Sequence, residues 1–145
     1  MIAEDLNLDR VTVGITIETA TLTPEQISER LGIAWDEVRR IGDPRGRTRN
    51  KWDCNVWRIF ERKQGTGNTV AHELIPHCLA DFMQRLVPIS SALRDISATE
   101  QGEFFIHVTA QSVPGLNISA DALRIIAAAN LSLDVDIILY GDEPD

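Results

Sequence analysis

A histidine-containing segment near the middle of the chain is the first place where residue types suggest metal chemistry. Residues 72–78 read HELIPHC and hold two histidines, a glutamate and a cysteine. A zinc-protease motif needs its histidines four positions apart, so that both lie on one face of a helix. His72 and His77 are five positions apart, which turns the second roughly 140° away from the first at about 3.6 residues per turn. Pro76 also disturbs the helix between them. We therefore predict no metal site.

Two aspartates in the last apolar segment are a second candidate. Asp134 and Asp136 are two positions apart in LDVDIILY, and in a strand both carboxylates would project from one face, about 6.5–7 Å apart. This spacing suits a bound cation or an acid/base pair. Alternation with Val135 and Ile137 suits equally well the solvent side of an edge strand, where charge deters aggregation. We favour the edge-strand interpretation.

The two cysteines, Cys54 and Cys78, form no C-x-x-C pair, and we expect both to be reduced. Cys78 falls in an apolar helical stripe and should be inert, whereas Cys54 lies among arginines and tryptophans and is the better candidate for a reactive thiol. The sequence contains no G-x-S-x-G, Walker A or dinucleotide-binding motif. We therefore predict no catalytic residues and no cofactor, so that the protein is not an enzyme.

Charge is spread unevenly along the 145 residues, whose net charge is −8. Between residues 39 and 63, nine basic residues face three acidic ones, which gives +6 in this segment and −14 in the rest of the chain. An acidic surface repels nucleic acid and anionic lipid. We expect no membrane contact, and we expect nucleic acid to be disfavoured everywhere except at the basic segment.

Arginines alternate with other residues inside this basic segment and lie next to tryptophans. Guanidinium groups bind phosphate or carboxylate in a bidentate manner, and indoles stack on bases or on arginine. The candidate ligand- or partner-binding residues are therefore Arg45, Arg47, Arg49, Trp52 and Trp57. The alternative, which stays open, is a solvated loop that balances the acidic body, with the tryptophans anchored in the core.

Alternation of apolar and polar residues predicts the strands that must position these groups. The clear strands cover residues 11–18, a segment from Asn55 to about residue 62, and residues 102–111, and DEVRRIG predicts a weaker one. A last strand covers residues 133–140. We expect its apolar residues to lie on the core side: Leu133, Val135, Ile137 and Leu139.

The first predicted helix, TPEQISERL, carries signals at both ends. Thr23 is suited to cap the helix, Pro24 occupies the first turn, and Gln26 completes a capping box. Gly32 suits the left-handed residue that follows a helix. The sequence therefore predicts a short helix that ends at about Leu31.

A long helical pattern follows over residues 69–97, and a last helix is predicted over residues 118–130. Pro76 and Pro88 interrupt the long pattern, because a proline inside a helix removes one backbone hydrogen bond. We expect either a kinked helix or two abutting pieces.

Together these elements predict an α+β fold. The expected architecture is a two-layer sandwich, in which a largely antiparallel sheet carries helices packed on one face. Its first six elements could form a ferredoxin-like β-α-β-β-α-β core, with an added helix and strand. We expect one domain over residues 1–145, with an ordered core from about residue 10 to residue 141.

The order of several sequence features resembles a known family. These features are TPEQISERLGI, Trp35, RRIGDPRGR, NVWRIF, the long helix, and ISADALRIIAAANLSLDVDIILY. Over residues 11–140 their arrangement is similar to the bacterial family of domain of unknown function 4279. The resemblance implies a small, cytoplasmic, single-domain α+β protein and carries over no reaction and no catalytic residue.

Acidic charge and the lack of an assembled catalytic motif favour a non-enzymatic interaction module, of a regulatory or immunity-like kind, with an unknown protein partner. The alternative is a binder of an anionic small ligand or of single-stranded nucleic acid at the basic segment. A homodimer is also open, since an exposed sheet edge is easily shared. The acidic N-terminal residues and the absence of an apolar stretch after them favour a cytoplasmic location.

Overall fold

A five-stranded sheet is built around β1 (Arg10–Thr19). β1 pairs antiparallel with β3 (Asn55–Gln64) on one side and with β4 (Gln101–Ala110) on the other. β2 (Glu37–Arg39) extends the sheet beyond β3, and β5 (Ser132–Leu139) adds parallel to β4 at the opposite edge. The strand order is therefore β2-β3-β1-β4-β5, in which every neighbouring pair is antiparallel except β4 with β5.

The structure is a computed structural model that describes residues 8–47 and 49–141. The termini included in the predicted domain of residues 1–145 lie outside the described residues. The helices follow between the strands: α1 (Pro24–Leu31), α2 (Ala71–Leu86), the 3₁₀ turn η2 (Val87–Ile89), α3 (Ser90–Ser97) and α4 (Ala120–Ala128). Among the described helices, none has the length and hydropathy that a membrane span requires.

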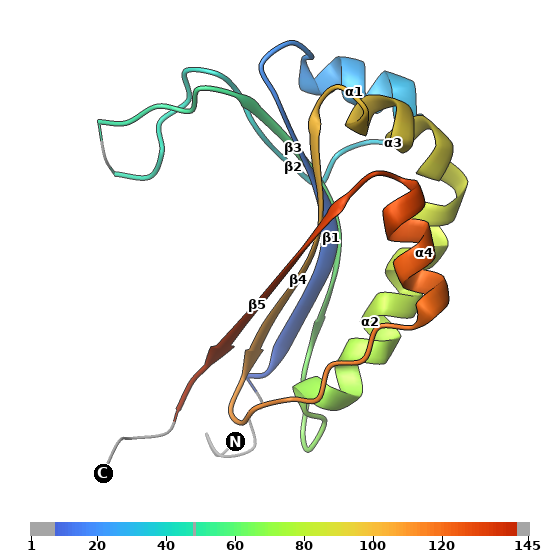
Figure 1. The fold of residues 1–145 in the computed structure, drawn as a ribbon. Helices are drawn as coiled ribbons and strands as arrows, with labels where there is room; N and C mark the ends of the chain where they lie inside the picture. The colour runs from blue at the N-terminus through green and yellow to red at the C-terminus, as the bar shows by residue number, and fades with distance from the viewer. Residues whose placement is uncertain (1–7, 48, 142–145) are drawn as a thin grey trace.

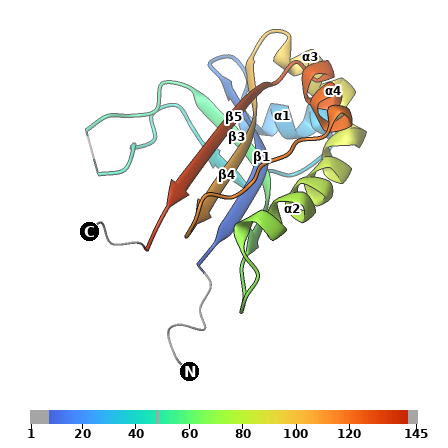
Figure 2. The same cartoon turned by 60° about the horizontal axis from the view of Figure 1, so that its bottom comes forward.

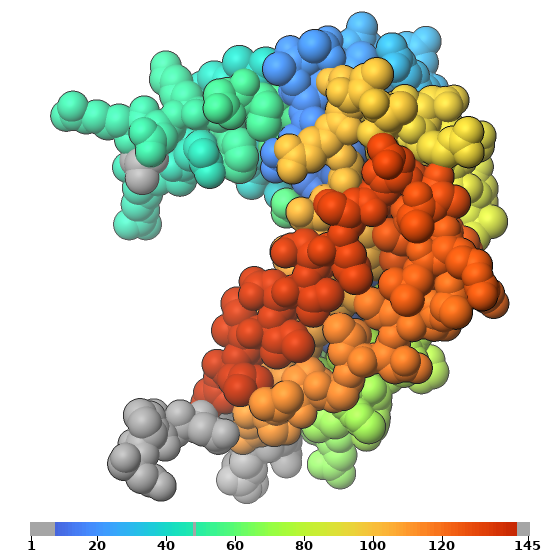
Figure 3. All heavy atoms as spheres, in the orientation of Figure 1, coloured from blue at the N-terminus to red at the C-terminus, as the bar shows by residue number. Residues whose placement is uncertain are grey.

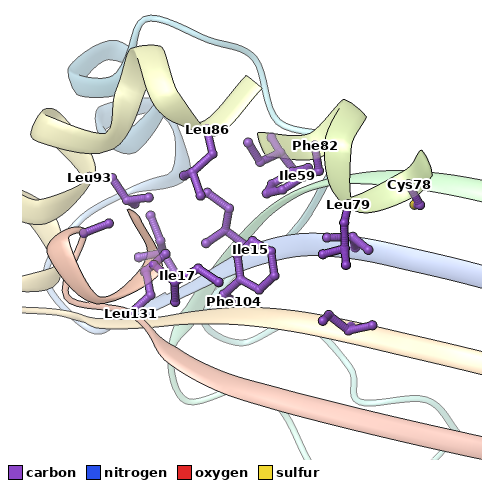
Figure 4. Packing of buried hydrophobic residues seen from close by; sticks show 14 of the residues in the cluster. Ile15, Ile17, Ile59, Cys78, Leu79, Phe82, Leu86, Leu93, Phe104 and Leu131 are labelled. Carbon is purple, nitrogen blue, oxygen red and sulfur yellow. The ribbon is translucent and has the colours of Figure 1, made fainter. Parts of the chain in front are cut away.

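Apolar and polar residues alternate along β1 as the sequence predicts. Val11, Val13, Ile15 and Ile17 are fully buried on the face that the helices cover. Figures 1 and 2 show from two directions that the helices lie on one side of the sheet only. Figure 4 shows the core between the layers, where apolar residues of the strands meet those of α2 and α3. The predicted two-layer α+β sandwich is confirmed.

α1 has both of its predicted end signals. The Thr23 side chain accepts a hydrogen bond from the Gln26 backbone N–H at 3.1 Å, and the Gln26 side chain accepts one from the Thr23 N–H at 2.9 Å. Gly32 follows in the left-handed conformation with φ of 74°. Such a reciprocal cap satisfies two backbone donors that a helix start leaves without partners.

The long helical segment is divided in two pieces, as one of the two expectations had it. Pro76 lies inside α2 without ending it, whereas Pro88 coincides with η2, which separates α2 from α3. With α2, η2 and α3 counted as one helical element, the first six elements run β-α-β-β-α-β, with β3 inserted between β1 and β2, which is a split βαβ arrangement. α4 and β5 are the added helix and strand.

The apolar stripe of β5 lies on the predicted side of the sheet but is only partly buried. Leu133, Val135, Ile137 and Leu139 lie on the helix side, because they pair with the buried residues Phe104, Ile106, Val108 and Ala110 of β4. Their exposed fractions are nevertheless between 38% and 51%. The helices cover β5 only in part, so the predicted side of the sheet is correct for these residues but their burial is incomplete.

Candidate functional site

The face of the sheet opposite the helices has no covering layer among the described residues. Figure 3 shows this face as a hollow between two projections. One projection is β5, and the other is the arm between β2 and β3, which we define as residues 40–47 and 49–54. Within this hollow, a pocket of about 250 Å³ is lined by residues of all five strands. We call this surface the open face.

Polar and charged residues of alternating strand positions line the hollow. Arg10 and Thr12 come from β1, Glu37 from β2, and Arg58, Phe60 and Arg62 from β3; β4 and β5 add Phe105, His107, Thr109, Asp136 and Ile138. The pairing register brings these side chains together, since Arg62, Thr12 and His107 are direct neighbours across β3, β1 and β4. Directly paired residues project from the same face of a sheet.

Arg58 is held from three directions. Its Nε donates a hydrogen bond to the Thr16 hydroxyl at 3.0 Å, and its Nη1 lies 3.5 Å from a Glu37 carboxylate oxygen. The guanidinium carbon lies 5.2 Å from the centre of the Phe105 ring, within the range of a cation–π interaction. Arg58 therefore has a counter-ion and a fixed position at one border of the hollow.

Arg62 is fixed in a similar way, but no counter-ion lies close to it among the described residues. Its Nε donates to the Thr12 hydroxyl at 3.2 Å, and its guanidinium carbon lies 5.0 Å from the Phe60 ring centre. Among the residues that the structure describes, no carboxylate oxygen lies within 4.0 Å of a guanidinium nitrogen of Arg62 or Arg10. The hollow thus contains two cations, Arg10 and Arg62, that no described carboxylate contacts within 4.0 Å, although Glu37 and Asp136 also line it.

Gly14 explains how the two phenylalanines come to flank the centre of the sheet. It is the direct neighbour of Phe60 on one side and of Phe105 on the other. A Cβ atom at this position would lie 2.7 Å from the Phe105 ring and 2.3 Å from the Ile59 carbonyl oxygen. The missing side chain therefore leaves room for the aromatic rings on which the guanidiniums of Arg58 and Arg62 rest.

Carboxylates gather on the β4–β5 side of the same face. His107 Nε2 lies 3.1 Å from an Asp134 carboxylate oxygen, and the His107 ring lies 4.7 Å from the Phe105 ring. Burial, together with the nearby charges of Asp134 and Glu18, raises the pKa of Glu103. The open face is therefore dipolar, with guanidiniums over β1 and β3 and carboxylates over β4 and β5.

The sequence-predicted arginines lie outside the hollow, on the arm. The Arg45 guanidinium stacks over the Trp52 ring at 4.4 Å, while Arg47 and Arg49 are exposed. Trp57 is not part of this surface. Its side chain is fully buried on the helix side and its indole N–H donates to the Ser28 hydroxyl at 2.9 Å. We therefore correct the candidate set by removing Trp57, for which the core-anchor alternative applies.

The other groups that the sequence offered as candidates, the histidines, cysteines and aspartates, do not come together in one site. His72 and His77 are both exposed on α2, and no group of three potential ligands among the described residues could hold a metal ion. Burial raises the pKa of the Cys78 thiol to about 11 and also raises the pKa of Cys54. A raised pKa leaves less thiolate at neutral pH, so Cys54 has no electrostatic activation. Asp134 and Asp136 lie on the open face of β5, which is an edge strand as expected.

Sequence reasoning missed the cations of the hollow. Arg58 and Arg62 belong to the basic segment, but their spacing with Phe60, every second residue of a strand, was the signal that they share one face. Arg10 and His107 come from strands far away in the sequence, and only the pairing register brings them to the same surface.

Comparison with known proteins gives a family. Neither a curated protein nor a solved structure matches the chain. The model of a family described as domain of unknown function (DUF4279) matches residues 9–140, a range that includes all five strands and the complete open face. This is the family that the order of the sequence features resembles. The chain belongs to the DUF4279 family.

Proposed function

We propose that the protein is a non-enzymatic interaction module that holds an acidic segment of a partner protein in the hollow of the open face. One observation supports the proposal most strongly. Arg10 and Arg62 line the hollow, and no carboxylate oxygen of the described residues lies within 4.0 Å of their guanidinium nitrogens, although the net charge of the chain is −8. A guanidinium keeps its proton at physiological pH and binds carboxylates in a bidentate manner. Such a pair of cations is suited to an anionic ligand.

The shape of the hollow favours a segment of a larger partner over an enclosed small molecule. The side chains of His107 and Asp134 are 42% and 48% exposed, and Arg10 and Arg62 are exposed as well. Small-molecule pockets bury about 70–90% of their ligand. A shallow surface that extends over several strands can instead bury one side of a peptide segment.

The separation of positive and negative charge on the open face favours one orientation of the bound segment. An acidic group would contact Arg10 and Arg62, whereas Asp134 and Glu103 on the β4–β5 side would repel it. A partner segment that carries acidic residues at one end and neutral or basic residues at the other is complementary to this pattern. A module that covers such a segment would act as a regulatory or immunity-like protein.

The arm supports a second candidate function. Arg47 and Arg49 are exposed next to the stacked pair of Arg45 and Trp52, which suits an anionic small ligand or single-stranded nucleic acid. Because Arg45 already covers one face of Trp52, a base would have to use the other face or displace the arginine. This second candidate uses residues that do not line the hollow.

The test compares the two surfaces with defined probes. A fluorescent peptide of ten residues, with glutamates in its N-terminal half and serines in its C-terminal half, is titrated with the protein, and its anisotropy is measured at low and at raised salt concentration. We expect saturable binding that weakens with salt. The double variant Arg10→Gln and Arg62→Gln should bind at least about tenfold more weakly, since a hydrogen bond to a charged group contributes about 1.5–3 kcal/mol.

Arg124→Gln is the matched control, because Arg124 is an exposed arginine on α4 whose partner is Asp121. We expect this variant to change the peptide affinity by less than about twofold. Equal losses in the control and in the double variant, or no binding of the peptide, would contradict the proposal. Binding of a ten-residue oligothymidylate that is lost in Arg47→Gln with Arg49→Gln would support the second candidate instead.

A further inference from the structure

β5 is a long edge strand whose protection against pairing with another chain is limited to two aspartates, Asp134 and Asp136, on the open face. It is eight residues long, whereas β2, at the opposite edge, has only three residues and contains Glu37 and Arg39. Protected edges are short, or carry lysine, proline or a bulge. β5 contains neither proline nor lysine, and it pairs with β4 residue by residue without interruption. Its free side offers a row of backbone donors and acceptors.

The side chains of β5 offer apolar surface next to that free edge. On the helix side, Val135, Ile137 and Leu139 are 39%, 38% and 51% exposed, and on the open face Ile138 is 56% exposed. Single exposed apolar residues are normal on protein surfaces, but a contiguous stripe marks an interaction site. A partner strand that pairs with this edge would cover both the backbone groups and the stripe.

Charge on β5 restricts how a second copy of the strand can pair with it. In an antiparallel pair centred on Val135, Asp134 of each copy would lie opposite Asp136 of the other copy, so that two pairs of like charges would meet. Like charges directly opposite each other destabilise a strand pair. A pair centred on Ile137 avoids this repulsion, because Asp136 then lies opposite Ile138 of the second copy.

The same register also matches the apolar residues. Ile137 lies opposite its own copy, and Val135 lies opposite Leu139 of the second copy, so that the exposed stripes meet on the helix side. Pairing centred on Ile138 would also separate the aspartates, but it would pair fewer of the described residues, which end at residue 141. One two-fold arrangement therefore satisfies backbone, apolar and charge requirements together.

We propose that β5 is a self-association surface, at which two copies of the chain pair antiparallel through β5, centred on Ile137, to form one continuous ten-stranded sheet. The interface is isologous, since the same strand contributes from both copies. Both helix layers lie on one side of the joined sheet and both open faces on the other. The surface adjoins the hollow, because Asp136 and Ile138 also line it, but the guanidiniums of Arg58 and Arg62 lie on its other side, over β3.

The two surfaces respond to salt in opposite directions. Each copy carries a net charge of −8, so screening reduces the repulsion between copies and should strengthen the dimer. Binding of an acidic peptide to Arg10 and Arg62 weakens with salt for the same physical reason. A salt series therefore separates failure of this proposal from failure of the proposed function.

Sedimentation equilibrium of the full chain, over a concentration series that reaches about 0.5 mM at raised salt, tests the proposal. We expect a reversible monomer–dimer equilibrium. Ile138→Lys places a lysine opposite Asp136 of the second copy and should tighten the dimer about three- to tenfold, whereas Ile138→Glu should weaken it by a similar factor. Both substitutions affect a side chain that is already 56% exposed, so folding is preserved.

Val87→Lys and Val87→Glu are the matched controls. Val87 is 52% exposed in η2, at the junction of the helices, and its substitution changes the net charge by the same amount. We expect both control variants to dimerise like the unmodified chain. A chain that stays monomeric over the whole series would overturn the proposal. Weakening by both Ile138 substitutions, or equal effects at Val87, would overturn the proposed register and surface.

Discussion

The two faces of the sheet use alternate residues of the same strands, and they differ in what covers those residues. Val13 and Ile15 of β1 are fully buried under helices. Thr12 and Thr16, which project from the other face, are also nearly buried at 9% and 4%, although none of the described helices lies on that face. The long side chains of Arg62 and Arg58 lie over them and bond to their hydroxyls. Arginine can cover surface with its aliphatic part while its charged end stays in water.

This difference shows that the exposed fraction of a residue alone does not determine how much that residue contributes to the free energy of unfolding. The helix-covered face excludes water with apolar groups, whereas the open face covers its threonines with charged groups that a ligand can contact. We expect substitutions on the covered face to reduce mainly the free energy of unfolding. Substitutions on the open face should reduce mainly ligand binding.

The largest effect is expected from a core truncation on the covered face. Phe104 is fully buried and its ring contacts that of Phe82 edge-on, with centroids 5.7 Å apart. Phe104→Ala should lower the free energy of unfolding by about 3–5 kcal/mol, through lost burial and the cavity left behind. Urea unfolding measures this. Phe60→Ala, on the open face, is the comparison and should cost less than half as much, because Phe60 is only half-buried. Equal losses would contradict the distinction between the faces.

A substitution at the centre of the open face should come next. Gly14→Ala introduces a Cβ atom 2.3 Å from the Ile59 carbonyl oxygen, and backbone must shift to relieve the contact. We expect a loss of about 1–3 kcal/mol, the usual range for overpacking. Thermal unfolding should show a clear decrease in Tm. Gly115→Ala, where a Cβ atom would meet nothing within 4 Å, is the control and should leave Tm almost unchanged.

The Asp9 carboxylate accepts hydrogen bonds from three separate segments of the chain, and we expect its contribution to the free energy of unfolding to depend on pH. Burial raises the pKa of Asp9, but hydrogen bonds from Tyr140 and from the N–H groups of Ala71 and Gln111 outweigh burial and leave the pKa below its ordinary value. A folded-state pKa below the unfolded one stabilises the protein above about pH 4 and ceases to do so as the pH falls through the folded-state pKa.

Asp9→Asn should therefore destabilise the protein by about 1–2 kcal/mol at pH 7, since hydrogen bonds to a charged group are replaced by weaker ones. The difference in unfolding free energy between the variant and the unmodified chain should shrink below about pH 4. Urea unfolding at a series of pH values measures it. A difference that stays constant down to the lowest pH would show that the Asp9 charge is not responsible.

The smallest effect on stability is expected for substitution of Arg62, one of the cations that line the hollow. Arg62 has no carboxylate within 4.0 Å among the described residues, so its charge has no described ion pair to lose. Arg62→Gln should change the free energy of unfolding by less than about 0.5 kcal/mol. The same variant should lower the affinity for an acidic peptide. A large stability loss without a change in peptide binding would reverse the roles assigned to the two faces.

Local sequence signals predicted the parts of the fold whose physics is local. The cap of α1 is one example, because Thr23, Gln26 and Gly32 act within one or two turns of the same helix. The alternation of β1 is another, since a period of two determines which residues share a face. The break at Pro88 also follows from the chemistry of a single residue.

The site was less predictable because it depends on contacts between distant residues. Arg10, Arg62 and His107 share the hollow only through the pairing of β1 with β3 and β4. The sequence prediction instead grouped neighbours along the chain and included Trp57, which alternation within β3 turns toward the core. The exposure of β5 was missed for a related reason, because the reach of the helices over the sheet is a property of the assembled layers.

The position of β1 in the middle of the sheet has a consequence for synthesis of the protein. Both neighbours of β1 follow it in the chain, and β4 is complete only at Ala110. A nascent chain therefore emerges from the ribosome with the valines and isoleucines of β1 lacking their final cover until most of the protein has been translated. Because such long-range pairing is slow and leaves apolar strand surface accessible, we expect this order of synthesis to lengthen the stage at which the young chain can aggregate.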